Sequence, residues 1–183
     1  PRLPFRGAHE LIARADVVLA IGTEFSDADV IYSGRRVEIR GHLVRIDTDP
    51  ANLHVPFRAD AAVLGDAAEA LHALAASVPV RTARDGASRT ATAREATDWT
   101  EQSLRHLPWV DAIERAVPGN TVQVLDSTQL AYTLHQALTL ATPTGRIAPY
   151  SLGTLGPALP MGVGAAIAEP ERPVLVITGD GGA

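Results

Sequence analysis

Residues 174–183, which read VLVITGDGGA, decide the predicted fold. Val174–Thr178 favours a β-strand, and Gly179-Asp180-Gly181 follows it as a turn. A short apolar run that ends at glycine is typical of a buried strand in a parallel sheet. Because ligands of open α/β sheets bind outside the carboxyl ends of the strands, this turn stands where a site would form.

Similar apolar runs recur along the chain and alternate with helical patterns. The other predicted strands are residues 17–21, 43–46, 61–65, 121–125 and 146–148; the predicted helices are residues 8–15, 67–77, 108–117, 129–138 and a small-residue helix that ends at Ala168. Asp66 can cap the helix 67–77, and Leu71 and Leu74 lie on its apolar face. The alternation predicts the α/β class, with doubly wound parallel sheets.

A polar segment separates two such stretches. Residues 78–97 are small, polar and basic without apolar periodicity, which predicts an exposed linker. We therefore predict two partial domains, at residues 1–77 and 98–183. Three strands before the linker are few for a doubly wound sheet, and a Gly-Asp-Gly turn normally leads into a helix, so we expect an internal fragment of a longer protein.

Composition excludes several kinds of chemistry. The 183 residues carry a net charge of -5, contain no cysteine, and use arginine for all 16 basic positions. The absence of lysine excludes Schiff-base and P-loop lysines, and the absence of cysteine excludes disulfides and thiolate nucleophiles. The acidic balance disfavours nucleic acid, and no apolar run approaches the about 18 residues of a membrane span. We expect a cytoplasmic protein without nucleic-acid or membrane partners.

The Gly-Asp-Gly turn suits an anion and a divalent cation together. Glycines on both sides of Asp180 let backbone N–H groups approach a phosphate. The carboxylate of Asp180, at a strand end, would hold a Mg²⁺ ion that bridges phosphate oxygens. On these residues alone, a plain β-turn is the alternative, since Asp-Gly is a frequent turn pair.

A glycine-rich segment precedes the helix that ends at Ala168. Gly162 and Ala165 predict that this helix packs closely on its neighbours. Leu155 is a lone bulky residue between Gly153 and Gly156, and we expect it to project away from the helix core and support a ligand. The six histidines have no metal-ligand spacing, so structural or surface roles are expected for them.

Several short motifs, in order, resemble the diphosphate-binding domain of thiamine diphosphate-dependent 2-oxo acid enzymes, the acetolactate synthase and benzoylformate decarboxylase group. They are Gly153-Thr154-Leu155-Gly156, Leu159-Pro160, Gly164-Ala165, residues 169–174 and Gly179-Asp180-Gly181. Residues 15–23, 46–50 and 64–67 resemble the second half of that family's central domain. The string Asp126-Ser127-Thr128-Gln129 is more similar to the decarboxylase-like members, including those acting on 5-guanidino-2-oxopentanoate, than to true acetolactate synthases.

The resemblance implies roles for particular residues. Residues 1–77 would be the C-terminal half of the Rossmann-like central domain, and residues 98–183 the N-terminal half of the cofactor-binding domain. Asp180 would be a Mg²⁺ ligand, Leu155 would hold the cofactor bent under its thiazolium ring, and Gly153 would offer its carbonyl to the 4′-amino group. The implied cofactor-binding set is Ser127, Thr128, Gln129, Gly153, Thr154, Leu155, Gly179, Asp180, Gly181 and Gly182. Ser127 can also act as a helix N-cap.

The resemblance also implies what lies outside this chain. The glutamate that activates the cofactor belongs to the family's pyrimidine-binding domain, so no catalytic residue is expected here, and the fragment alone should be inactive. A homo-oligomer, at least a dimer, is expected. FAD-binding members carry roughly Arg-Phe-Asp-Asp-Arg after the first strand, whereas residues 24–28 here are Glu-Phe-Ser-Asp-Ala. We therefore expect no bound FAD.

The implied activity is Mg²⁺-dependent decarboxylation of a 2-oxo acid on thiamine diphosphate, with an aldehyde released or a second carbonyl compound joined. One alternative is a non-catalytic α/β module that uses residues 179–183 to bind a nucleotide or another anion. A dehydrogenase is disfavoured, because Gly22-Thr23-Glu24 follows the first strand where such enzymes carry Gly-x-Gly-x-x-Gly.

Overall fold

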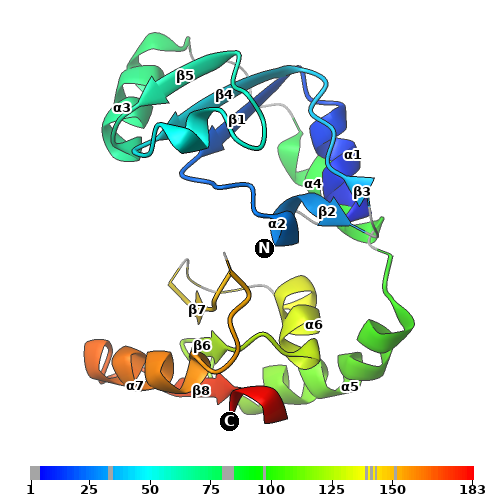
Figure 1. The fold of residues 1–183 in the computed structure, drawn as a ribbon. Helices are drawn as coiled ribbons and strands as arrows, with labels where there is room; N and C mark the ends of the chain where they lie inside the picture. The colour runs from blue at the N-terminus through cyan, green and yellow to red at the C-terminus, as the bar shows by residue number, and fades with distance from the viewer. Residues whose placement is uncertain are drawn as a thin grey trace. The chain divides into compact units, whose positions relative to one another are not determined.

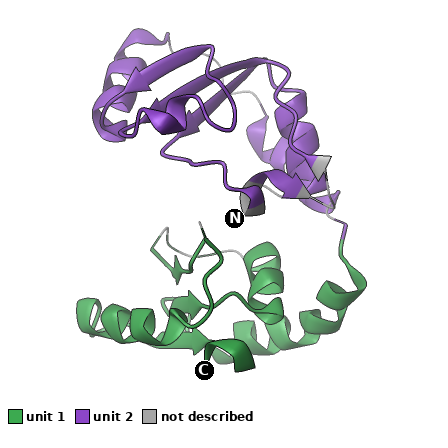
Figure 2. Ribbon diagram, in the orientation of Figure 1, with its two compact units in different colours: residues 1, 99–183 green, residues 2–98 purple. Residues whose placement is uncertain are grey.

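The computed structural model describes residues 5–32, 35–79, 85–96, 98–138, 140, 142, 144–150 and 152–183. The chain divides into two compact units, an N-terminal unit of Arg2–Asp98 and a C-terminal unit of Trp99–Ala183 (Figure 2). The division falls between Asp98 and Trp99, one residue after the end of the predicted linker 78–97. Each unit contains a parallel sheet with helices, so the predicted α/β class is confirmed.

The N-terminal unit is built on a sheet in the order β1-β4-β5 (Figure 1). Both pairings are parallel, with Ile21 opposite Ile46 and Val44 opposite Ala61. The elements of this unit are α1 (Arg6–Ala13), β1 (Val17–Ile21), α2 (Asp27–Val30), β2 (Ile31–Tyr32), β3 (Arg35–Arg36), β4 (His42–Asp47), η1 (Ala51–Leu53), β5 (Ala61–Leu64), α3 (Ala67–Ser77) and α4 (Gly86–Glu95). Asp66 caps α3 as predicted, accepting hydrogen bonds from the backbone of Ala68 and Glu69.

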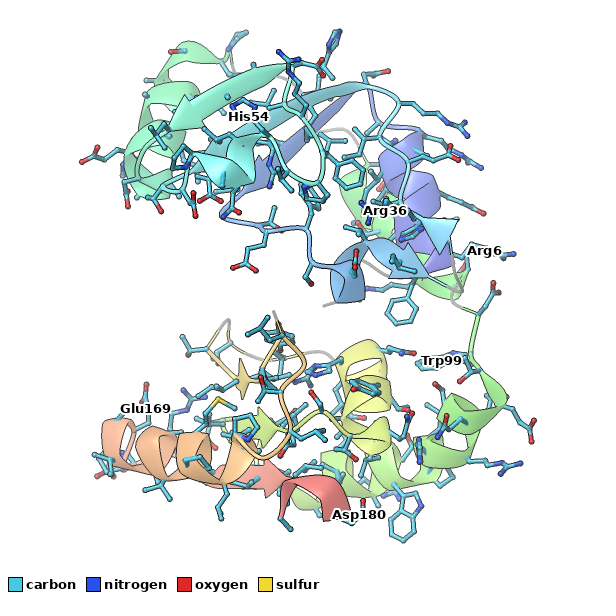
Figure 3. All side chains as sticks on the ribbon, viewed as in Figure 1. Arg6, Arg36, His54, Trp99, Glu169 and Asp180 are labelled. Atoms are coloured by element: carbon cyan, nitrogen blue, oxygen red, sulfur yellow. The ribbon has the colours of Figure 1, made fainter. Side chains whose placement is uncertain are left out.

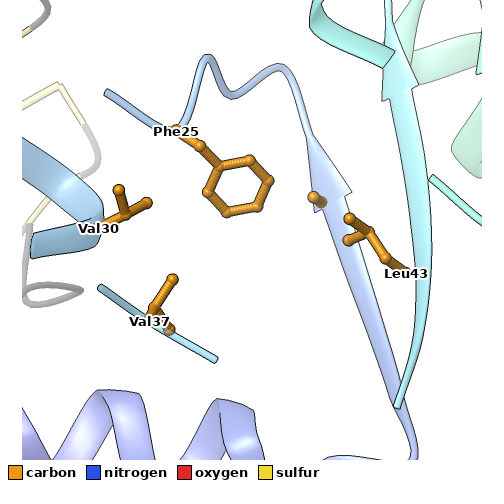
Figure 4. Packing of buried hydrophobic residues seen from close by; sticks show 5 residues of the cluster. Phe25, Val30, Val37 and Leu43 are labelled. Carbon is orange, nitrogen blue, oxygen red and sulfur yellow. The ribbon is translucent and has the colours of Figure 1, made fainter. Parts of the chain in front are cut away.

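The core of the N-terminal unit lies between β1, β4 and the segment after β1. Figure 4 shows Phe25, Val30, Val37 and Leu43 meeting there. Below Phe25, the guanidinium of Arg45 is buried and donates hydrogen bonds to the carbonyls of Thr23, Val55 and Phe57, at 2.6–3.0 Å. These three bonds fix the two loops that follow β1 and η1, because each of them ends at a backbone carbonyl of one of these loops.

The expected burial of β1 is wrong for this chain. Val17 and Leu19 of β1 are 56% and 41% exposed, and β5 is exposed throughout. The predicted apolar face of α3 is also open, since none of its residues is buried. An apolar run sets strand formation locally, whereas its burial requires a packing partner from elsewhere in the fold.

The predicted linker is not irregular throughout. Its residues 86–95 form α4, which begins where the carboxylate of Asp85 accepts a hydrogen bond from the backbone of Ser88. The helix packs closely on α1, where a methyl group added at Gly7 would overlap the carbonyl of Ala93. Helix α4 lacks an apolar face, so a search for periodicity misses it, whereas its cap and its alanines favour it. Residues 80–84 and 97 of the linker lie outside the described residues.

The C-terminal unit contains a parallel sheet in the order β7-β6-β8. Its elements are α5 (Glu101–Ala116), β6 (Val122–Leu125), α6 (Gln129–Ala137), β7 (Arg146–Ile147), α7 (Ala158–Ala168), β8 (Val174–Ile177) and η2 (Asp180–Gly182). Helix α5 starts seven residues before the predicted Pro108, because Thr100 caps it by accepting from Ser103. None of the helices in the described residues is long and apolar enough to cross a membrane.

Helices cover both faces of the central strand β6. Leu125 packs with α5 and α6, whereas Val122 and Val124 pack with Ala158 and Ala165 of α7. Gly162 allows α7 to approach β8, since a methyl group there would overlap Val176. The predicted close packing of the small-residue helix is therefore confirmed. This packing brings the segment before α7 to the carboxyl ends of β6 and β8.

Candidate cofactor site

Three segments meet at the carboxyl edge of the β7-β6-β8 sheet. The 126–129 loop follows β6, the 178–182 turn follows β8, and the 153–157 loop leads into α7. Because β6 and β8 are parallel neighbours, their carboxyl ends lie at the same edge, as expected for a ligand site in an α/β sheet. All ten residues of the predicted cofactor-binding set lie in these three segments.

Asp126 joins the three segments. Its side chain is only 2% exposed, and its carboxylate accepts from the N–H of Ser127 at 2.8 Å. The N–H of Gly156 donates to both carboxylate oxygens at 3.0 Å, and the hydroxyl of Thr178 donates to Oδ2 at 3.1 Å. The sequence prediction missed Asp126, although an acidic residue directly after a strand was an available signal.

The 126–129 loop offers two hydroxyl groups. Thr128, not Ser127, is the N-cap of α6, and it makes no side-chain capping bond, so the N-cap alternative for Ser127 is wrong. Within the described residues, neither hydroxyl has a hydrogen-bond partner, and the Thr128 hydroxyl lies 3.2 Å from where a methyl group at Gly179 would stand. These hydroxyls and the N-terminus of α6 suit an anion. No described hydrogen bond ties the side chain of Gln129 to the other two segments.

The 153–157 loop projects Leu155 outward. Gly153 and Gly156 adopt φ angles of 59° and 89°, a left-handed backbone that favours glycine. The side chain of Leu155 is 60% exposed and lies next to Gly181. Among the described residues, no partner is found for the carbonyl of Gly153 or the N–H of Leu155, and Thr154 is exposed. These features fit a flat heterocycle that needs one apolar support and polar backbone groups.

Asp180 is exposed at the first position of η2, in the middle of the 178–182 turn (Figure 3). Its carboxylate has no hydrogen bond or ion pair within the described chain. The turn is closed by the N–H of Gly182, which donates to the carbonyl of Gly179 at 3.0 Å. No three carboxylates or imidazoles gather as a metal site in the described ranges. At Asp180 the described residues thus offer one carboxylate to a Mg²⁺ ion, which commonly also binds phosphate oxygens and water.

His135 of α6 has a strongly shifted acidity. Burial, and then the positive charge of Arg146, lower its pKa to about 3. Its ring lies 5.2 Å from that of Tyr150, and its Nδ1 atom is buried without a hydrogen-bond partner. The folded protein therefore holds His135 in its neutral form at pH 7.

We expect acid to destabilise the C-terminal unit through His135. Between pH 6.5 and about 3 the unfolded chain binds a proton at His135 and the folded chain does not, so stability falls as the pH falls through this window. At about pH 4.5 the loss is up to about 3 kcal/mol. His135→Gln should remove that dependence, measured as the free energy of unfolding in urea at both pH values. His72→Gln, at an exposed position on α3, is the control, and equal pH dependence in the two variants would contradict the expectation.

Two family models match the chain. The thiamine pyrophosphate enzyme central domain matches residues 3–74, and the C-terminal TPP binding domain of the same enzymes matches residues 126–183. The second match starts at Asp126 and covers all three segments of the site. Thiamine pyrophosphate is another name for thiamine diphosphate.

Curated relatives align with almost the whole chain. "Probable 2-ketoarginine decarboxylase AruI" of Pseudomonas aeruginosa is 39% identical over 180 residues, which are 94% of this chain and 31% of that protein. "Probable acetolactate synthase large subunit" of Methanocaldococcus jannaschii is 27% identical over 203 residues, covering 97% of this chain and 32% of that protein. The chain thus spans about a third of the length of these relatives.

A solved structure has the same fold. It is the X-ray structure of a Mycobacterium smegmatis protein described as a thiamin diphosphate-dependent enzyme, and it superposes with a TM-score of 0.70 at 20% identity over 97% of this chain and 35% of that one. Together with the two domain matches, which lie in the two units in the expected order, this confirms the resemblance that the sequence motifs indicated. The chain belongs to the thiamine pyrophosphate enzyme family, and it carries sequence of that family's central domain and of its C-terminal TPP binding domain.

Proposed function

We propose that the protein containing this chain is a thiamine diphosphate- and Mg²⁺-dependent enzyme that decarboxylates a 2-oxo acid. The observation that carries the proposal is the meeting of the 126–129 loop, the 153–157 loop and the 178–182 turn around Asp126. In this proposal residues 1–77 and 98–183 are parts of two domains, with the central domain first and the cofactor-binding domain second.

The 126–129 loop and the 178–182 turn would share the diphosphate, and the 153–157 loop would face the rings of the cofactor. Ser127, Thr128 and the backbone of Gly181 and Gly182 would hold the diphosphate, and Asp180 would offer its carboxylate to Mg²⁺. The carbonyl of Gly153 and the N–H of Leu155 would bind the pyrimidine, and the Leu155 side chain would support the cofactor. Gln129 and Thr154 border the same edge. Thiamine diphosphate, when bound, supplies the carbon nucleophile and the electron sink for loss of CO₂.

The substrate we propose is a 2-oxo acid with a guanidino group. The name of the Pseudomonas aeruginosa relative, 39% identical, gives 2-ketoarginine as its substrate, and the name of the Methanocaldococcus jannaschii relative refers to acetolactate. The higher identity to the first favours decarboxylation with release of an aldehyde over carboligation. We further propose that the protein is cytoplasmic and works as a homo-oligomer.

The direct test is a titration of the full-length protein with thiamine diphosphate. We expect binding that requires Mg²⁺, followed by CO₂ release from 5-guanidino-2-oxopentanoate. Pyruvate serves as the comparison substrate, because its small side chain carries no positive charge. Absence of thiamine diphosphate binding would refute the proposed function, while binding with turnover of pyruvate alone would refute only the proposed substrate.

The same preparation tests the flavin prediction. Glu24 and Ala28 stand where FAD-binding relatives carry arginine, and the side chain of Phe25 between them is buried in the core. We expect purified full-length protein to be colourless and to release no flavin on denaturation. Added FAD should leave its melting temperature unchanged. A yellow preparation with one flavin per chain would contradict this expectation.

A further inference from the structure

We propose that Asp126 is a positioning residue, which fixes the spacing between the 153–157 loop and the 178–182 turn so that both face one cofactor. This inference rests on the proposed function. Asp126 is not among the groups expected to touch the cofactor, and its side chain is almost completely buried. It acts through the three segments that its carboxylate joins.

Both oxygens of Asp126 are used across the site. Oδ1 accepts from the N–H groups of Ser127 and Gly156, and Oδ2 accepts from Gly156 and the hydroxyl of Thr178. The partners Gly156 and Thr178 lie 30 and 52 residues away in the sequence. An ionised carboxyl group suits this set, because it is acceptor-only on both oxygens. An asparagine with its N–H₂ group in the place of Oδ2 would face the N–H of Gly156 with a second donor, and the Thr178 hydroxyl would have to accept in place of donating.

The turn after β8 rests directly on this carboxylate. A methyl group added at Gly182 would overlap Oδ2 of Asp126 and would lie 2.7 Å from the hydroxyl of Thr178. The backbone of Gly182 therefore lies so close to the carboxylate of Asp126 that no side chain fits between them. Because Asp180 precedes Gly182 by two residues in this turn, a shift of Asp126 would move the proposed Mg²⁺ ligand.

The N-terminal unit provides a matched carboxylate without this role. Asp47 ends β4, as Asp126 follows β6, and it is also buried. Its carboxylate accepts from the N–H of Asp49 at 2.9 Å and from the side chain of Asn52 at 3.3 Å, so its bonds are local. Asp47→Asn is therefore a control for the loss of a buried carboxylate at a strand end.

The experiment uses the full-length protein with Asp126→Asn, Thr178→Val and Asp47→Asn. In cofactor-free protein, hydrogen–deuterium exchange is followed in peptides covering residues 153–157 and 178–182. Asp126→Asn should raise exchange in both peptides by at least about tenfold, because a buried hydrogen bond to a charge is lost. Thr178→Val, which removes one bond and keeps the side-chain shape, should raise it mainly in the second peptide.

The second measurement is thiamine diphosphate affinity at saturating Mg²⁺. Asp126→Asn should raise the dissociation constant by about 10- to 100-fold, as expected for one lost hydrogen bond to a charged group. Asp47→Asn should lower the melting temperature and leave this constant unchanged. If Asp126→Asn lost only stability, and kept the cofactor affinity and the exchange of the two peptides of the wild type, the inference would be wrong.

The two measurements separate this inference from the proposed function. If the wild-type protein does not bind thiamine diphosphate, the proposed function fails, and the exchange data then decide the role of Asp126. Raised exchange in both peptides would support its positioning role, and unchanged exchange would refute it. If the wild type binds and Asp126→Asn binds equally well, the inference fails and the proposed function stands.

Discussion

Asp180→Ala should raise the dissociation constant for thiamine diphosphate in the presence of Mg²⁺ by at least about 100-fold, which corresponds to about 2.7 kcal/mol. The carboxylate is exposed in the middle of the 178–182 turn and has no partner within the described residues, so its removal costs the fold little. It would cost the site its proposed side-chain ligand to Mg²⁺, and the diphosphate charge would then lack a counter-ion. Calorimetry with and without Mg²⁺ measures the change.

Two further variants make the Asp180 result specific. Asp180→Asn keeps one oxygen ligand and should give an intermediate dissociation constant. Asp111→Ala removes an exposed carboxylate from α5 and should leave cofactor affinity unchanged. If Asp180→Ala bound thiamine diphosphate with wild-type affinity, the proposed Mg²⁺ role would be wrong. The Gly-Asp-Gly segment would then be a plain β-turn, the alternative that its sequence alone also allows.

Leu155→Ala should lower kcat by about 100-fold while it changes thiamine diphosphate affinity by less than about tenfold. The side chain is 60% exposed, so its removal takes little from the core of the C-terminal unit. Its proposed task is to hold the cofactor bent, so that the proton at the reacting carbon lies within reach of the group that removes it. The affinity should survive because the diphosphate contacts lie on other residues.

Leu159 on α7 provides a matched control for Leu155. It has the same 60% exposure and lies four residues further along the chain. Leu159→Ala should keep kcat near the wild-type value at saturating thiamine diphosphate. Measuring kcat together with the melting temperature separates the two explanations for Leu155→Ala. If the Leu155→Ala variant lost stability and kept the wild-type kcat, Leu155 would be an ordinary packing residue.

The strands of the two parallel sheets could be predicted from the sequence because their signals are local, whereas the short antiparallel pair β2-β3 was not predicted. Val17–Ile21 was predicted with its observed ends, and Asp66 caps α3 as its position indicated. Helix starts were less predictable where the signal was a cap and not an apolar face. Helix α4 and the first turns of α5 begin at Asp85 and Thr100, whose side chains accept backbone hydrogen bonds that no periodicity reveals.

By itself, the sequence determined the α/β class, the strands of the two parallel sheets and the family, because short apolar runs, glycine turns and ordered motifs are read along the chain. Only the tertiary structure decided which polar groups meet. Asp126 acquires its partners from Gly156 and Thr178 because β6 and β8 pair in parallel and Gly162 lets α7 approach β8. Pairing register and close packing act between distant residues, and a local pattern does not encode them.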